Sequence, residues 1–300
     1  MTPAVLDGTM GQWMTDLPED YFHVDESVEG THKLQVLPTE QVGWKKSRRV
    51  LLGVTKGVIR DGKLWSVSGE KPTVNENIVT FHNDAVACGN GFDIIDYETH
   101  CKLAHLFYTK YADRNPQAME QFGTGSSTTG RISGTTASLG NNDGKSDTQV
   151  AFLGVEDPYG NVYEWMGGIH LNGQTCYIYD GFEPDQVPTA PYREYTTSLT
   201  DQYGYISKVE WGEYGDMIPT ELSGSYTTHY CDYGGNAGGS DWCVFDRSCN
   251  YSHVDGGFAC FYGSNSSSFV NSAIGSRLQY RGNIEVIDDP VTFIAMPVGF

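Results

Sequence analysis

One stretch of the chain carries sustained helical periodicity, and this limits the folds that the remainder can form. Apolar side chains recur at helical spacing over residues 94–111, with Asp93 as the predicted N-cap and Asn115-Pro116 as the stop. A shorter helical stretch over residues 80–88 precedes it. No other convincing amphipathic helix follows Pro116, which argues against a parallel βαβ array. The sequence therefore predicts an α+β fold with two helices and short irregular strands.

Short segments with strand-like composition make up much of the remainder. The hairpin over residues 57–65 is the clearest, because Asp61-Gly62 is a strong two-residue turn signal between apolar flanks. Residues 123–146 are nearly pure Gly, Ser, Thr and Asn and are predicted to form a long surface loop. We expect a small β-rich N-terminal region over residues 1–72 and a larger domain over residues 73–300. The predicted strands are 33–37, 49–54, 150–153, 161–165, 175–179, 206–211, 258–262 and 291–296.

The charge balance excludes two classes of partner. The 300 residues include 19 Lys+Arg and 38 Asp+Glu, which gives a formal net charge of −19. Binding to a phosphate backbone needs a basic surface, so we expect no nucleic-acid partner, and the same balance argues against docking on an anionic membrane. The chain has no apolar run of about 18 residues, so no membrane insertion is expected. Residues 1–19 contain acidic residues and no basic one, and we expect no secretory signal peptide there.

The cysteines and the motif inventory give no support to familiar catalytic or metal sites. Seven cysteines form an odd, irregular set, so free thiols are predicted rather than a disulfide framework. The sequence lacks the His-Glu-x-x-His, phosphate-binding-loop and Gly-x-Ser-x-Gly patterns. His100 and His105 are five residues apart on a predicted helix and do not share a face. We therefore predict no catalytic residue, no metal ligand set and no cofactor.

Residues 231–280 differ in composition from the rest of the chain. Gly, Ser, Tyr and Asn fill 25 of these 50 positions, while Lys, Glu and Pro are absent. Tyr and Trp supply contact area at little entropic cost, and Ser, Gly and Asn supply adaptable hydrogen bonds, so this is the composition of a binding surface. A bare Gly/Ser-rich loop is the alternative, but Phe258, Phe261 and Ile274 indicate that the segment is folded.

Two short elements resemble a known branch of a known fold. The segment Gly-Asn-Val-Tyr-Glu-Trp at residues 160–165 and the segment Ala-Ile-Gly-Ser-Arg-Leu at residues 273–278 resemble elements of the formylglycine-generating-enzyme-like branch of the C-type lectin fold. Further stretches are similar to phage tail or receptor-binding proteins whose lectin-fold domain is diversified by a diversity-generating retroelement. These stretches are 66–69, 91–97, 138–141, 154–161 and 218–220.

The resemblance implies which residues form the scaffold. A C-type lectin-fold domain would occupy residues 73–300, after the small N-terminal region. Trp165 and Ile274 would pack in the scaffold, with Glu164 facing solvent or pairing with an amide. Arg277 would hold the last loop through backbone carbonyls.

The resemblance also implies a variable, ligand-binding segment over about residues 232–271. This sequence departs from the family where Asp246-Arg247-Ser248-Cys249 replaces the usual Gly-Gly-Ser-Trp stretch. Trp242 and Phe245 fit a core position equally well. The predicted ligand contacts are Tyr233, Asn236, Trp242, Phe245, Asp246, Arg247, Cys249, Asn250, Tyr251, His253, Tyr262, Ser264 and Asn265.

The function implied is recognition of a protein or glycan receptor on a target cell surface, without catalysis. The protein would belong to a virion tail or a bacterial surface, and tail proteins of this kind are commonly homotrimers. One alternative is a copper-dependent oxidase of the formylglycine-generating type that uses Cys243 and Cys249, since soft thiolates suit Cu(I). Another is a purely structural tail protein whose C-terminal loops pack against a neighbouring subunit.

Overall fold

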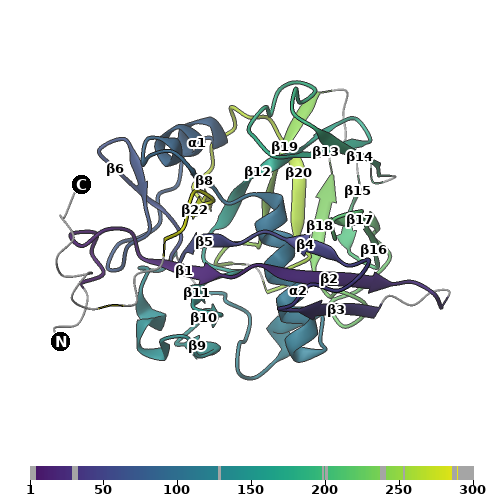
Figure 1. Ribbon diagram of the computed structural model, residues 1–300, viewed down its shortest axis with the longest axis horizontal. Coiled ribbons are helices and arrows are strands. Elements are labelled where there is room, and N and C mark those ends of the chain that lie inside the picture. Colours follow the sequence, from purple (N-terminus) through teal and green to yellow (C-terminus); the bar gives the residue numbers. More distant parts are fainter. Residues whose placement is uncertain are drawn as a thin grey trace.

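The computed structural model describes residues 5–28, 33–127, 130–197, 199, 202–236, 241–252, 254–285 and 289. In this part of the chain most regular structure is β-strand, and two α-helices pack against the strands (Figure 1). The predicted strand at residues 291–296 lies outside the described residues. Within them, no helix is both long and apolar enough to cross a membrane.

The two predicted helices are confirmed, with shifted bounds. Helix α1 spans Ile78–Val86 and helix α2 spans Tyr97–Tyr111. The predicted N-cap Asp93 is wrong, because residues 92–94 form a strand and the side chain of Asp96 accepts the capping hydrogen bond from the Thr99 amide at 2.8 Å. The short 3-10 helices are η1 (Pro116–Ala118) and η2 (Thr135–Leu139).

The largest sheet carries much of the C-terminal half of the chain. Its order is β14-β13-β12-β19-β20-β18-β15, and β21 pairs with β12 at one end. Neighbouring strands are antiparallel except β18 with β20 and β21 with β12, which are parallel. The strands are β12 (Tyr163–Asn172), β13 (Thr175–Tyr179), β14 (Tyr192–Thr196), β15 (Gln202–Tyr205), β18 (Tyr233–Asn236), β19 (Trp242–Arg247), β20 (Phe261–Asn265) and β21 (Ile274–Gly275).

A second sheet joins residues from the two ends of the sequence. It contains β1 (Met14–Leu17), β5 (Val50–Gly53), β22 (Leu278–Tyr280) and β8 (Phe92–Ile94), in that order. Strand β5 therefore lies beside β22, more than 200 residues later in the chain. The proposed division after residue 72 stays a prediction.

The remaining strands form small sheets around these two. The predicted hairpin at Asp61-Gly62 is confirmed. The predicted loop over residues 123–146 is only partly a loop, because η2 and a strand that pairs with its neighbour interrupt it. These strands are β2 (Asp20–Asp25), β3 (Lys33–Leu37), β4 (Lys45–Ser47), β6 (Val58–Arg60), β7 (Lys63–Trp65), β9 (Gly144–Ser146), β10 (Gln149–Phe152), β11 (Val155–Glu156), β16 (Lys208–Trp211) and β17 (Met217–Glu221).

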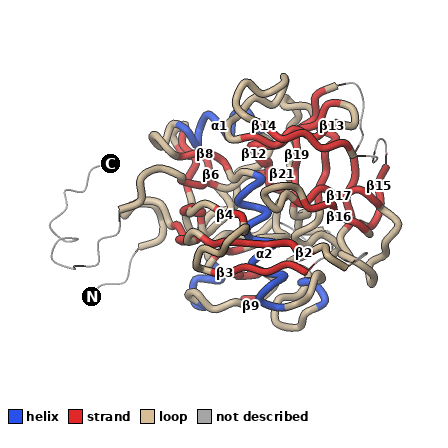
Figure 2. Tube along the Cα trace, turned by 45° about the vertical axis from the view of Figure 1, so that its right-hand side comes forward, coloured by secondary structure: helices blue, strands red, loops and turns tan. Residues whose placement is uncertain are grey.

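Helix α2 packs against one face of the large sheet and builds the main core there (Figure 2). Phe107 of α2 contacts Phe258 with ring centroids 4.9 Å apart, and Tyr97 of α2 contacts Phe245 of β19. We call this the inner face of the sheet. A second core cluster, which contains Trp165 and Ile274, forms beneath α1. Both residues are buried, as the sequence predicted.

The prediction that Glu164 faces solvent is wrong. Its side chain is 0% exposed and lies on the inner face, opposite Arg247. The carboxylate binds Arg277 and Arg247 at 2.7 Å each. Arg277 also donates to backbone carbonyls, as expected, so it bridges the buried carboxylate and several loops.

Candidate binding surface

The strand register shows which side chains lie on the face of the large sheet opposite α2, which we call the outer face. Residues opposite one another in paired strands project to the same side. Asp246 lies opposite Tyr262, and both Tyr262 and Tyr203 lie opposite Gly235. Since side chains alternate along a strand, Trp242 shares the face of Asp246. Two aromatic side chains on the outer face, Trp165 and Tyr179, are buried. The other aromatic side chains that the register assigns to this face are Tyr163, Tyr177, Tyr192, Tyr203, Tyr205, Tyr233, Trp242 and Tyr262.

The first aromatic group lies towards the β14 edge. Tyr177 contacts Trp242 and Tyr192, with ring centroids 5.7 Å and 5.6 Å apart. The Trp242 ring packs edge-on against buried His170 at 5.0 Å. Tyr192 is 39% exposed, so part of this aromatic group is accessible to a partner, while the ring contacts within the group restrict its movement.

The second aromatic group lies towards the β15 edge. Tyr262 contacts Tyr163 edge-on at 5.5 Å and lies 6.4 Å from Tyr203, which is 50% exposed. Beside it, Tyr205 and Tyr233 pack edge-on at 5.2 Å. These rings arise from strands that are far apart in the sequence, and only the fold brings them together.

A cavity of about 230 Å³ opens beside Tyr262. Its walls combine polar side chains with aromatic rings, which is the usual composition of a ligand site. Five of the predicted contacts line it, namely Asp246, Asn250, Tyr262, Ser264 and Asn265. The other lining residues are Tyr163, Phe269, Asn271, Ala273 and Ile274.

Asp246 is the acidic group of this cavity. Its side chain is almost completely buried, and Asn265 Nδ2 donates a hydrogen bond to its Oδ2 at 2.9 Å. Burial raises the pKa of Asp246 to about 7, because an ionised carboxyl loses hydration there. Its protonation therefore changes close to neutral pH.

Four of the predicted contacts lie in the interior and are unavailable to a ligand in this structure. Phe245 stacks on Phe261 in the core, with ring centroids 5.9 Å apart. Arg247 is 0% exposed and forms an ion pair with Glu164. Asn236 and Cys249 are likewise buried, and the Cys249 thiol donates to a backbone carbonyl. The run Trp-Cys-Val-Phe-Asp-Arg in β19 does not alternate between apolar and polar residues, so its two faces cannot be told apart from the sequence.

Three further predicted contacts have other placements. Tyr233 and Trp242 are half-buried on the outer face, as described above. Tyr251 is also half-buried, and its amide donates to the Asn161 carbonyl at 2.8 Å. His253 lies outside the described residues.

Sequence reasoning missed several outer-face aromatics, notably Tyr163, Tyr177, Tyr192, Tyr203 and Phe269. All but Phe269 precede residue 231, where the unusual composition begins. In β14 the burial pattern alternates strictly, with Tyr192 and Glu194 exposed. The sequence of this strand, Tyr-Arg-Glu-Tyr-Thr, does not alternate between apolar and polar residues, so it did not indicate an exposed strand face.

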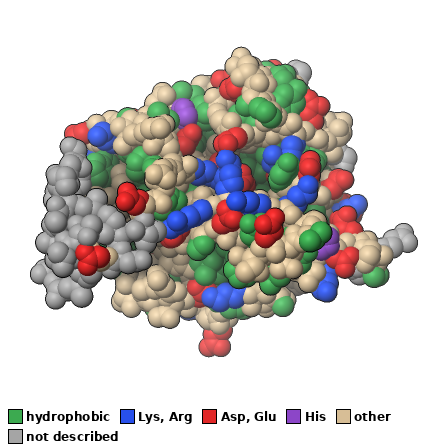
Figure 3. All heavy atoms as spheres, viewed as in Figure 1, with side chains coloured by type: hydrophobic (Ala, Val, Ile, Leu, Met, Phe, Trp, Pro, Cys, Tyr) green, Lys and Arg blue, Asp and Glu red, His purple; other side chains and the backbone are tan. Residues whose placement is uncertain are grey.

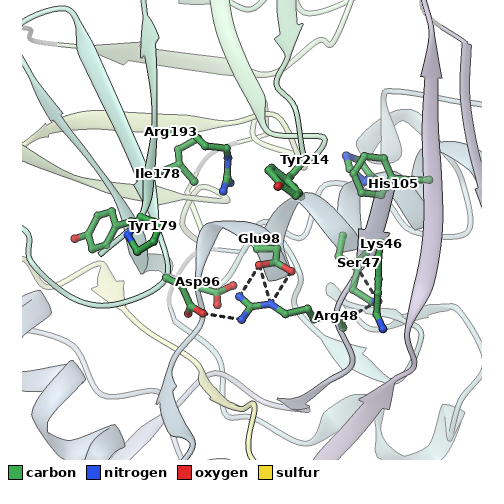
Figure 4. Close-up of a pocket in the computed structure, with 15 residues that line it drawn as sticks. Lys46, Ser47, Arg48, Asp96, Glu98, His105, Ile178, Tyr179, Arg193 and Tyr214 are labelled. Carbon is green, nitrogen blue, oxygen red and sulfur yellow. Dashed lines mark hydrogen bonds and ion pairs between the residues drawn. The ribbon is translucent and has the colours of Figure 1, made fainter. Parts of the chain in front are cut away.

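A second cavity, of about 240 Å³, lies at the start of α2 (Figure 4). Figure 3 shows Lys and Arg side chains gathered across the middle of one face of the molecule, interleaved with Asp and Glu. Residues from the N-terminal strands, α2 and the β13–β14 edge line the cavity. Its charged residues are Lys46, Arg48, Asp96, Glu98, Lys102, Asp180 and Arg193.

The cations of this second cavity are already paired with acids of the chain. Arg48 binds Glu98 at 2.6 Å and Asp180 at 2.7 Å, as Figure 4 shows for Glu98. This pairing leaves no excess positive charge for an anionic ligand. We therefore interpret the cavity as part of the contact between the N-terminal strands and the large sheet. The other pairs are Lys102 with Asp20, Arg193 with Asp216 and Lys46 with Glu19.

All seven cysteines are free thiols, as predicted. Cys243 projects to the inner face, where burial raises the pKa of its thiol. Burial likewise raises the pKa of the Cys249 thiol. In the described part of the chain, no group of three or more His, Cys, Asp or Glu side chains is placed to hold a metal ion.

Comparison with known proteins gives only distant matches. No protein-family model matches the sequence, and no curated protein does. Among solved structures, the chain is similar to the Major Tropism Determinant P3c variant, at 9% identity and a TM-score of 0.33. It is also similar to the U1 variant of that protein, at 10% identity and a TM-score of 0.32. Each match covers 93% of this chain and 73% of the other.

Proposed function

We propose that this protein is a receptor-binding protein that recognises a protein or glycan on a target cell surface through the outer face of its large sheet. The observation that carries the proposal is the collection of partly exposed aromatic rings on this face, beside which a polar cavity opens. Aromatic anchors of this kind supply most of the binding energy in protein interfaces. The face needs no catalytic group, and the proposed activity is binding alone.

The finer parts of the proposal rest on the sequence resemblance. It assigns residues 73–300 to a C-type lectin-fold domain and residues 232–271 to a segment diversified by a retroelement. A virion tail is the proposed location and a homotrimer the proposed assembly, since several copies would strengthen binding by weak single sites. Strand β19 and the cavity wall from β20 lie within this proposed variable segment.

A binding assay with matched variants tests the proposal. Fluorescently labelled protein is applied to a panel of bacterial strains and to a glycan array, and bound label is measured. We expect Trp242→Ala and Tyr262→Ala to weaken wild-type binding at least roughly tenfold, the usual effect of truncating an aromatic anchor. Tyr214→Ala is the control, because Tyr214 is 44% exposed and lies at the second cavity. Binding to no strain or glycan, or equal loss in all three variants, would contradict the proposal.

A further inference from the structure

The carboxyl of Asp246 is buried and lacks the cationic partner that the buried carboxyls of Glu164 and Asp216 have. Glu164 pairs with Arg277, and Asp216 pairs with Arg193 at 2.6 Å. Within the described residues, Asp246 makes no ion pair, and its neutral partner is the Asn265 amide. It lines an open cavity instead of a packed interior.

The surroundings of Asp246 supply no compensating charge. Its titratable neighbours include Tyr163, Tyr262 and Cys260. Burial raises the pKa of each of them, so all three are neutral near pH 7. Neighbouring Arg247 projects to the inner face and is bound to Glu164. An ionised Asp246 would therefore be a buried charge without a cationic partner, which is energetically unfavourable unless a ligand supplies a positive charge.

The cavity walls also favour a cation. Tyr262 and Tyr163 meet edge-on beside Asp246, and Phe269 contributes a ring that is 38% exposed. Aromatic faces attract ammonium and guanidinium groups, with the largest effect where water is excluded. The net charge of −19 would further draw a basic partner towards the surface.

We propose that this cavity binds the alkylammonium or guanidinium group of a basic side chain on the target, with Asp246 as its counter-ion. The inference rests on the proposed function, and it specifies the chemistry of the partner at that site. A neutral sugar would leave the buried carboxylate uncompensated, whereas a cation converts it into a buried ion pair. Since a cation stabilises the ionised form of a carboxyl whose pKa is about 7, affinity should rise between about pH 6 and about pH 8.

The test uses small probes and the full chain. Nα-acetyl-lysine amide is titrated into isotope-labelled protein, with Nα-acetyl-norleucine amide as the uncharged probe and methyl glucoside as the sugar probe. The reporter is the NMR signal of the Asn265 side-chain amide, which donates to Asp246. We expect a saturable shift with the lysine probe alone, with a dissociation constant of roughly 1 mM, as suits a single contact. Equal shifts with the norleucine or sugar probe, or no saturable shift, would overturn the inference.

Three variants sharpen the result. Asp246→Asn should weaken lysine-probe binding roughly tenfold or more and abolish its pH dependence. Phe269→Leu should weaken it by about two- to fivefold, because the exposed ring is lost while apolar volume is kept. Asp241→Asn, which removes an exposed acid in the same loop and strand region, should leave binding unchanged. Retained binding in Asp246→Asn, or equal loss in Asp241→Asn, counts against a specific counter-ion.

The two proposals fail separately. If the lysine probe binds as expected but the protein binds no cell or glycan, the receptor-binding function fails. If cell binding depends on Tyr262 and Trp242 while the probe does not bind, the cation-binding inference fails.

Discussion

Arg277 Nε lies 2.7 Å from Glu164 Oε1, and both side chains are 0% exposed. The Arg277 guanidinium also donates to the carbonyls of Gly53, Val54, Glu156 and Asp157 at 2.7 to 3.0 Å. This one side chain thereby connects β12, the loop after β5 and the β11 turn. Burial alone would raise the pKa of Glu164, but Arg277, Lys56 and Arg247 outweigh it and hold that pKa at about 2.

Removing the Glu164 charge should destabilise the whole fold. Glu164→Gln leaves the buried cations Lys56, Arg247 and Arg277 without their shared counter-ion. We expect the free energy of unfolding to fall by about 3–5 kcal/mol, the usual cost of breaking a buried pair. Urea denaturation measures it. Asp16→Asn, which breaks an exposed pair with Arg49, is the control and should cost less than about 1 kcal/mol. Similar unfolding midpoints for the two variants would refute the structural role of Glu164.

The stability of the protein should depend on pH through Asp246. Its pKa in the folded state is about 7, above the ordinary value of 3.8. The contribution of Asp246 to the free energy of unfolding is therefore fully present below pH 3.8 and is lost as the pH rises through 7. Asp246→Asn removes this dependence. From pH 5 to pH 8 the free energy of unfolding of the wild type should therefore fall by about 2–3 kcal/mol more than that of the variant. Denaturation of both proteins at the two pH values gives the double difference, and a difference near zero would show that Asp246 titrates normally.

The thiols should react slowly in the folded state. Burial raises the pKa of both Cys243 and Cys249, which keeps them protonated and unreactive at neutral pH. We expect a colorimetric thiol reagent at pH 8 to label half-buried Cys88 first and the others only after urea is added. Mass spectrometry of partly labelled protein identifies the site. Fast native labelling of Cys243 and Cys249 would favour the copper-oxidase alternative, and stoichiometric copper lost in Cys243→Ser would establish it.

The two faces of the large sheet should tolerate substitution differently. Outer-face positions such as Trp242 and Tyr233 should accept many residues with stability changes within about 1 kcal/mol, whereas inner-face Phe245 and Arg247 should not. Natural copies of the locus from one population provide the measurement, scored codon by codon. If variation is uniform over residues 232–271, or absent there, the proposed diversified surface is wrong.

The sequence by itself determined the local elements. Apolar spacing located α2, and the Asp61-Gly62 turn located the β6–β7 hairpin, because these structures depend on neighbours within a few residues. The composition of residues 231–280 directed attention to the segment that contributes Asp246, Tyr262 and Asn265 to the cavity. Each of these signals is contained in a short window of sequence.

Only the tertiary structure decided which of those residues face outwards. The register of β12 with β19 buries Arg247 against Glu164 and turns Asp246 to the other side, and a shift of one residue would exchange them. Likewise, Tyr163 and Tyr203 join Tyr262 through pairings between distant strands. Strand register is set by contacts across the whole chain, including the Arg277 bridge to Glu164, and no local pattern in the sequence contains that information.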